Sequence, residues 1–264
     1  MTRWVAFAAL TAAVVGVMLA AARASTRALS TTDTADTAAG LESLPDGADH
    51  LDATTAERQH PSSTPSPDAL PTQALLLNLA VSHGFLAAVL AAGIWLANVP
   101  LASLGVGAGP VTGSIAVAVG LAVGAAIAVV NTLLSVVASR LNVDPSEQLR
   151  SLLAPETTLD WALLCFVVFP IVAGFEELLF RGILVGAFAV GFDLSPWLLA
   201  VVSSALFAAG HGAQGRLGVV ATGVLGFVLA AVFISTGSLL VVAVAHYVVN
   251  VVEFLVAEGL GWTP

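Results

Sequence analysis

Long apolar stretches make up most of this chain and leave few charges to cover a surface. Of the 264 residues, 58% are hydrophobic and 9% are charged, and the mean hydropathy is +0.98. A soluble domain carries charges at about 25% of its positions. Because a run of about 20 apolar residues crosses a bilayer as a helix, the sequence predicts an all-α integral membrane protein, placed in the cell membrane.

About seven apolar runs qualify as transmembrane helices. The first lies in residues 1–23, with an apolar core at 4–22. It also resembles a cleavable secretory signal, because Arg3 precedes it and the small-residue sequence Ala22-Arg23-Ala24 follows it. Its length favours a retained helix, since a signal core has about 7–15 residues. The other spans are expected at about 74–97, 114–138, 160–190, 196–211, 217–234 and 238–257.

Residues 24–72 differ in composition from the rest of the chain. They hold eight of the 17 acidic residues, are rich in Ser, Thr, Ala and Pro, and show no hydrophobic period. Such a segment cannot bury enough apolar surface to offset the entropy of ordering. It is predicted to be a disordered acidic linker, followed by a polytopic helical domain at 73–264. Within that domain, Asp144-Pro145-Ser146-Glu147 is typical of a helix start and predicts a short helix in the membrane interface.

The arginines give the chain an orientation. Seven spans place most of them in loops on one side of the membrane, which the positive-inside rule makes cytoplasmic. The N-terminus is therefore expected outside and the C-terminus in the cytoplasm, with Arg3 as the exception. The arginines on the cytoplasmic side are Arg23, Arg27, Arg58, Arg140, Arg150 and Arg216.

Composition disfavours one class of partner and excludes two features that need several cysteines. The net charge is −9, which disfavours nucleic acid as a partner, because nucleic-acid binding needs a basic face. Cys165 is the single cysteine, so an intrachain disulfide and a multi-cysteine metal site are excluded. Glycines spaced four apart, Gly120 with Gly124 and Gly182 with Gly186, indicate close helix packing rather than chemistry.

The fourth span carries three charged residues at membrane depth, namely Glu176, Glu177 and Arg181. A charge at the centre of a membrane helix costs on the order of 2.5–3.5 kcal/mol on insertion scales. Glu177 and Arg181 are spaced i,i+4 and are predicted to form a structural ion pair. Glu176 points about 100° away from Glu177 and has no local partner, which suits a role in proton transfer.

Two later spans add polar residues that can meet Glu176. His211 ends the fifth span, and His246 and Asn250 share one face of the seventh. One carboxylate and two imidazoles from three helices are able to bind a metal such as Zn²⁺ or to activate a water, and both readings stay open. An asparagine beside them is a candidate oxyanion donor. His83 lacks such companions and is assigned to a helix–helix hydrogen bond.

Three ordered motifs, Glu176-Glu177-x-x-x-Arg181, Phe207-x-x-x-His211 and His246-x-x-x-Asn250, resemble the signature of the CPBP family of intramembrane proteases. These are also called type II CAAX prenyl endopeptidases or Abi proteins. The resemblance covers about residues 158–257. It implies an intramembrane endopeptidase in which Glu176 and His211 activate water and His246 and Asn250 line the oxyanion side. The family is described both as metalloproteases and as metal-free enzymes.

The resulting expectation is a polar cavity among spans four to seven that faces the cytoplasm. There, peptide bonds of membrane-anchored polypeptides, prenylated or CAAX-like ones included, would be hydrolysed beside the lipid bilayer. Glu176, His211 and His246 would be the ligands of a metal. Two alternatives are a proton- or ion-coupled transporter and a catalytically silent immunity or sorting scaffold of the same fold.

Overall fold

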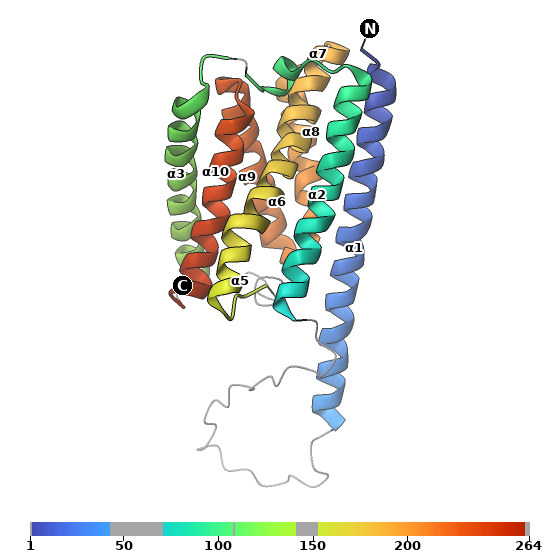
Figure 1. The fold of residues 1–264 in the computed structure, drawn as a ribbon. Helices are drawn as coiled ribbons and strands as arrows, with labels where there is room; N and C mark the ends of the chain where they lie inside the picture. Colours follow the sequence, from blue (N-terminus) through green and yellow to red (C-terminus); the bar gives the residue numbers. More distant parts are fainter. Residues whose placement is uncertain (1, 43–70, 108, 141–152, 262–264) are drawn as a thin grey trace, which may run out of the picture.

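The computed structural model describes residues 2–42, 71–107, 109–140 and 153–261, with side chains described to residue 27 in the first helix and to residue 137 in the third (Figure 1). These residues are helical, with no strand among them. The chain crosses one bundle seven times, so that its two ends lie at opposite ends of the bundle (Figure 1). The predicted all-α membrane fold is confirmed.

Seven passes are built from fourteen helical elements in the described ranges. The first three passes are α1, α2 and α3, with the short helix η1 between the second and third. The fourth pass joins α5, η2, α6, η3 and α7, and the last three are α8, α9 and α10. The bounds are α1 Trp4–Glu42, α2 Thr72–Ala97, η1 Leu101–Leu104, α3 Gly113–Arg140, α5 Thr158–Leu163, η2 Leu164–Val168, α6 Phe169–Glu177, η3 Leu178–Ala187, α7 Phe188–Phe192, α8 Pro196–Gly210, η4 Gly212–Gln214, α9 Gly215–Thr236, α10 Leu239–Phe254 and η5 Leu255–Gly259.

Six of the passes are long and apolar enough to cross a membrane within the described part of the chain. The remaining pass, α8, is apolar but has 15 residues, fewer than the roughly 20 that a full crossing needs. The protein is thus an integral membrane protein with six long spans and one short one. The fifth predicted span is the short one, because Ser195-Pro196 starts it and the glycine-flanked His211 ends it.

The first helix extends further than the sequence analysis predicts. α1 continues to Glu42, so residues 24–42 are helical where a disordered linker is expected. The remainder of that predicted linker, 43–70, lies outside the described residues, and so does most of the predicted interfacial helix, at 141–152. Phe7, Val14 and Val15 of α1 are buried in one apolar core with residues of α2, α6 and α8. Whether the helix is retained or cleaved stays a prediction.

The fourth pass changes its winding on both sides of α6. Pro170 lies in the first turn of α6, and the π-helical turn η2 immediately precedes it. Proline has no N–H and its ring crowds the carbonyl one turn earlier, so wider winding relieves the clash. A second π-helical segment, η3, follows Glu177 and contains Arg181. Such segments are frequent at functional sites because they re-aim the side chains that they carry.

The predicted close approach of helices holds at the Gly120 and Gly124 pair. A Cβ on Gly120 would lie 2.7 Å from Val244 Cβ, and one on Gly124 would lie 2.7 Å from the carbonyl oxygen of Ala245. These glycines therefore allow the backbones of α3 and α10 to pack in direct contact. Gly186 likewise packs closely against the carbonyl of Ser103. A Cβ on Gly182 would make only ordinary van der Waals contacts.

Gly124→Leu is expected to destabilise the bundle by about 1–3 kcal/mol, because overpacking forces backbones apart. The added side chain meets the backbone of Ala245, which cannot rotate away. The melting temperature in detergent, followed by tryptophan fluorescence, measures this effect. Gly16→Leu is the matched control, since no atom lies within 4 Å of a Cβ on Gly16 in α1. Equal melting temperatures for the two variants would contradict the packing described here.

Candidate active site

The polar residues of α6 are buried rather than exposed to lipid. Glu176 and Glu177 are 6% and 0% exposed, and Arg181 in η3 is 1% exposed. His246 of α10 is 4% exposed and lies against them. The i,i+1 spacing of the two glutamates sends their carboxylates in different directions, so each has a different environment.

Glu177 forms the centre of a buried network that joins three helices. Arg181 donates from one guanidinium nitrogen to Glu177 Oε1 at 2.6 Å, which is the predicted pair. The other terminal nitrogen donates to the carbonyl of Gly226 in α9 at 2.9 Å. His246 donates from Nδ1 to the same Glu177 Oε1 at 2.7 Å. Because one carboxylate oxygen accepts from two side chains, Glu177 fixes the ring of His246 as well as the guanidinium.

An aromatic ring also contacts the guanidinium of Arg181. The guanidinium carbon lies 4.8 Å from the ring centroid of Phe207 in α8, within the range of a cation–π interaction. Gly226 leaves room for this arrangement, since a Cβ there would lie 3.2 Å from the Phe207 ring and 3.4 Å from the arginine nitrogen. Ser203 ties α8 to the fourth pass by donating to the carbonyl of Phe180 at 2.7 Å.

Glu176 has a looser environment than Glu177. Its Oε2 atom lies 3.7 Å from Nε2 of His246, beyond the usual length of a hydrogen bond. Its carboxylate is therefore close to an imidazole nitrogen without being held by it. A carboxylate that is near a histidine and not locked in an ion pair is available to take a proton from a reacting group.

His211 lies at the junction where α8 ends. Nδ1 donates to the carbonyl of Phe207 one turn earlier, at 2.8 Å. This bond assigns the proton to Nδ1 and leaves the lone pair on Nε2. The Phe207 ring is close to both histidines, with its centroid 4.6 Å from that of the His211 ring and 6.0 Å from that of the His246 ring. His211 thus reaches the cluster through Phe207, and the described residues show no hydrogen bond from it to Glu176.

Asn250 is half-buried one turn after His246 on α10, as the shared face predicts. His83 lies apart from the cluster. Its Nδ1 donates to Leu79 in its own helix at 2.9 Å, and its ring stands edge-on to Phe175 at 5.3 Å. The hydrogen bond predicted for His83 is therefore within one helix and not between two.

Sequence reasoning missed the second partner of Glu177. The i,i+4 spacing predicts the pair with Arg181, but nothing local indicates that His246 reaches the same oxygen. The contributions of Gly226 and Phe207 to the arginine site were missed for the same reason. Their signal is weak, since a glycine in a membrane helix usually reports packing alone.

The donor set does not fit a bound metal ion in this arrangement. Within the described ranges, no three His, Cys, Asp or Glu side chains are grouped so that they could hold one. Nε2 of His246 lies 3.7 Å from the carboxylate of Glu176, but no contact among the described residues brings His211 to either of them. A site for Zn²⁺ at Glu176, His211 and His246 stays a prediction that would require these side chains to move.

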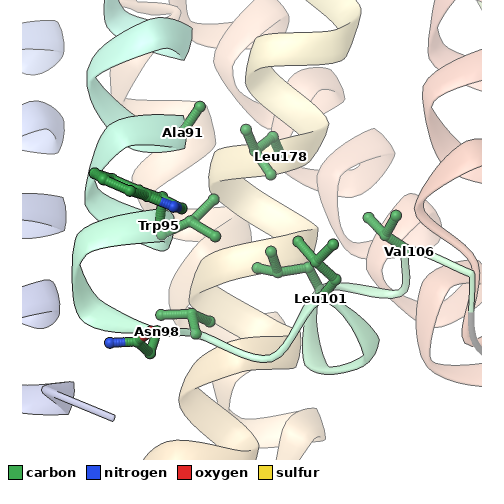
Figure 2. A pocket seen from close by; sticks show the side chains of 9 residues that line it. Ala91, Trp95, Asn98, Leu101, Val106 and Leu178 are labelled. Carbon is green, nitrogen blue, oxygen red and sulfur yellow. The ribbon is translucent and has the colours of Figure 1, made fainter.

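Two hollows lie next to the site rather than in it, and both are apolar. The larger, of about 500 Å³, opens between α2, η1 and the fourth pass, with Trp95 and Asn98 at its edge and Leu178 opposite (Figure 2). The smaller, of about 300 Å³, lies between α6 and α10 beside Gly174 and Tyr247. Neither is lined by the polar cluster, so the predicted polar cavity facing the cytoplasm stays a prediction.

The fold and the cluster together define a polytopic helical membrane protein with a buried site of carboxylates and histidines on three converging passes. Residues 158–252 match the family described as type II CAAX prenyl endopeptidase Rce1-like. The matched segment starts with α5, ends within α10 and includes every predicted site residue. This match lies over the same part of the chain as the resemblance drawn from the sequence motifs, and it confirms that resemblance. Searches of curated proteins and of solved structures found no match.

Proposed function

We propose that the protein is an intramembrane endopeptidase that hydrolyses peptide bonds of membrane-anchored polypeptides. The observation that supports this most is the pair of Glu176 and His246, 3.7 Å apart and buried inside a CAAX protease-family domain. The pair offers a carboxylate able to accept a proton and an imidazole held in place by Glu177. Those two groups are what hydrolysis of an amide by water requires.

In the proposed reaction, Glu176 takes a proton from a water molecule while the water oxygen attacks the carbonyl carbon of the scissile peptide. Nε2 of His211 accepts a hydrogen bond from the same water and orients it. The resulting tetrahedral oxyanion collapses, the C–N bond breaks, and the proton held by Glu176 passes to the leaving amine. The products are a new carboxylate and a new amine, which balances one water against one peptide bond.

His246 and Asn250 are proposed to stabilise the oxyanion. Glu177 accepts from Nδ1 of His246, and this stabilises an imidazolium whose Nε2–H is able to donate to developing negative charge. The Asn250 amide is the second donor from the same helix face. Glu177 therefore acts as a positioning residue for His246, in addition to pairing with Arg181.

The substrate is proposed to be a polypeptide tethered in the bilayer by a hydrophobic or prenyl group. The site lies between helices of a bundle whose outer surface is apolar, with exposed residues such as Phe166 and Val201 facing lipid. A tethered substrate is confined to the same two-dimensional layer, which raises its effective concentration at the site. By the arginine distribution, it approaches from the cytoplasmic side.

The proposal is tested by incubating the purified protein in liposomes with a membrane-tethered peptide and identifying products by mass spectrometry. Wild type is expected to produce two fragments from one peptide bond. His211→Ala is expected to lower kcat by about 10²-fold, since one positioned group contributes about 10²–10⁴ to proton transfer. Ser235→Ala, which removes an exposed hydroxyl on α9, is the control. No cleavage by wild type, together with proton or ion flux, would favour a transporter instead.

Elemental analysis of the same preparation, with activity measured before and after a chelator, tests the cofactor. Because the described donors do not converge on one point, hydrolysis is expected to survive chelation and metal content to stay below one equivalent. Stoichiometric zinc that is lost together with activity would instead place Glu176, His211 and His246 around a metal in the working state.

A further inference from the structure

The first helix contacts the turn that carries His211, although it lies outside the family domain at 158–252. Figure 1 shows α1 running beside α2 along the whole height of the bundle. It contacts α8 and the turn η4, at the junction of α8 and α9. α1 is thus positioned to influence a residue of the proposed site from outside the catalytic domain.

The turn around His211 is rich in glycine and is held by a few local hydrogen bonds, among them those from the His211 N–H to the Ala208 carbonyl and from the Gln214 N–H to the His211 carbonyl. Gly210 and Gly212 flank the histidine, and Gly215 closes the turn with a φ of 72°. His211 itself has φ −108° and ψ 26°, outside helical geometry. Glycine allows many backbone states, so the place of the imidazole depends on what packs against the turn as well as on its hydrogen bond to the Phe207 carbonyl.

Two side chains of α1 pack against these flanking glycines. Met18 Cε lies 3.3 Å from the position of a Cβ on Gly210, and Thr26 Oγ1 lies 3.4 Å from that on Gly212. Both glycines are therefore already in contact with α1. The Thr26 hydroxyl donates to the carbonyl of Ala22 at 2.9 Å, which fixes its orientation.

The upper part of α1 is anchored in the same core as the site. Phe7, Val14 and Val15 are buried in a cluster with Phe175 and Phe207, and Met18 packs on that cluster. Phe175 precedes Glu176, and Phe207 accepts the hydrogen bond of His211 through its carbonyl. The helix α1 therefore shares a core with the element that carries Glu176 and contacts α8, which ends at His211.

We propose that α1 positions His211 for catalysis, through contacts of Met18 and Thr26 with the glycines on either side of it. This inference rests on the proposed function, since it assigns α1 a part in that reaction. Displacing α1 lets the turn relax and moves Nε2 of His211 away from the water, which lowers the rate of the chemical step. Substrate binding, which does not require Met18, is unchanged.

Met18→Ala is the first test, on the membrane-tethered peptide. It is expected to lower kcat about tenfold with KM unchanged, because small displacements of a catalytic group cost up to about 10²-fold. Met18→Leu, which restores the volume, is expected to recover most of the rate. Val17→Ala is the control, since Val17 is 58% exposed on the neighbouring face of α1. Met18→Ala with wild-type kcat would overturn the proposal.

A disulfide between α1 and the His211 turn tests whether the Met18→Ala defect comes from a displaced His211 or from a general loss of stability. A sulfur in place of Thr26 Oγ1 would lie about 3.4 Å from the Cβ of Gly212→Cys, near the geometry of a disulfide. Thr26→Cys with Gly212→Cys, in a Cys165→Ala background, is therefore expected to cross-link on oxidation. The Met18→Ala variant is then made in this double-cysteine background. When its cross-link is oxidised, its kcat is expected to equal that of the cross-linked protein that keeps Met18. Reduction of the cross-link is expected to lower kcat again.

The outcomes distinguish the two proposals. A wild type that does not cleave refutes the endopeptidase function, whatever the α1 variants do. A wild type that cleaves, with a Met18→Ala defect that the formed cross-link does not rescue, refutes the positioning role alone. Failure of the two cysteines to cross-link also refutes it, because α1 then does not lie against the His211 turn in the membrane.

Discussion

Glu176→Gln is expected to abolish peptide cleavage while leaving the protein folded. Glutamine keeps the size of the side chain but cannot accept a proton from water, so kcat should fall by about 10²–10⁴-fold. The fold should survive, because the contact given for Glu176 among the described residues is the 3.7 Å approach to His246, which is longer than a hydrogen bond. The melting temperature in detergent is accordingly expected to match wild type, and KM should change little.

The control for this variant is Glu156→Gln, which removes an exposed carboxylate before α5 and should leave kcat unchanged. Both variants remove one carboxylate charge, but only Glu176 is buried beside His246. A difference in kcat between them is therefore due to the position of the carboxylate. Glu176→Gln protein that cleaves at the wild-type rate would remove Glu176 from the mechanism, and the endopeptidase proposal would lose its proton acceptor.

Arg181→Met is expected to have the largest effect on stability, with a loss of about 3–5 kcal/mol. The guanidinium holds Glu177 at 2.6 Å and the carbonyl of Gly226 at 2.9 Å. Without it, the carboxylate of Glu177 is left buried beside His246 alone. A charge in that position lacks both water and a full partner, which is costly in a low-dielectric interior. Thermal unfolding followed by tryptophan fluorescence measures the loss.

The matched control removes a charge of the same type from the surface. Arg216→Met, at an exposed position at the start of α9, is expected to change the melting temperature little. The double variant Arg181→Met with Glu177→Met is expected to be more stable than Arg181→Met alone, because it removes the stranded carboxylate. A single variant as stable as wild type would show that the network is not needed for the fold.

The transmembrane passes could be predicted from the sequence because the pattern that marks each of them is local. An apolar run of about 20 residues has few alternatives to a membrane helix, and the i,i+4 spacing of Glu177 and Arg181 specifies a contact on one helix. The short α8 was predicted as a full span, because hydropathy marks an apolar run but not its depth. The helical extension of α1 was missed because the polar composition of 24–42 does not favour a helix.

The site was only partly predictable because its contacts join distant parts of the chain. The order of the three motifs placed Glu176 and His246 in one interior, which the structure shows at 3.7 Å. It did not show that Glu177, rather than Glu176, holds His246 most closely, at 2.7 Å. Two adjacent glutamates differ by about 100° on a helix, and which of them faces α10 depends on how the π-helical turns rotate the fourth pass.

The length of α8 has a consequence for how water enters the membrane. Fifteen residues rise about 22 Å, less than the roughly 30 Å of the hydrocarbon layer. Because α8 begins at the end of the bundle where α7 ends (Figure 1), its last turn stops short of the opposite surface. The peptide groups that follow cannot be hydrated by lipid tails. At this depth such groups are covered either by protein or by water. We expect water to reach the turn after α8, which would place it beside His211, the residue proposed to orient the nucleophile.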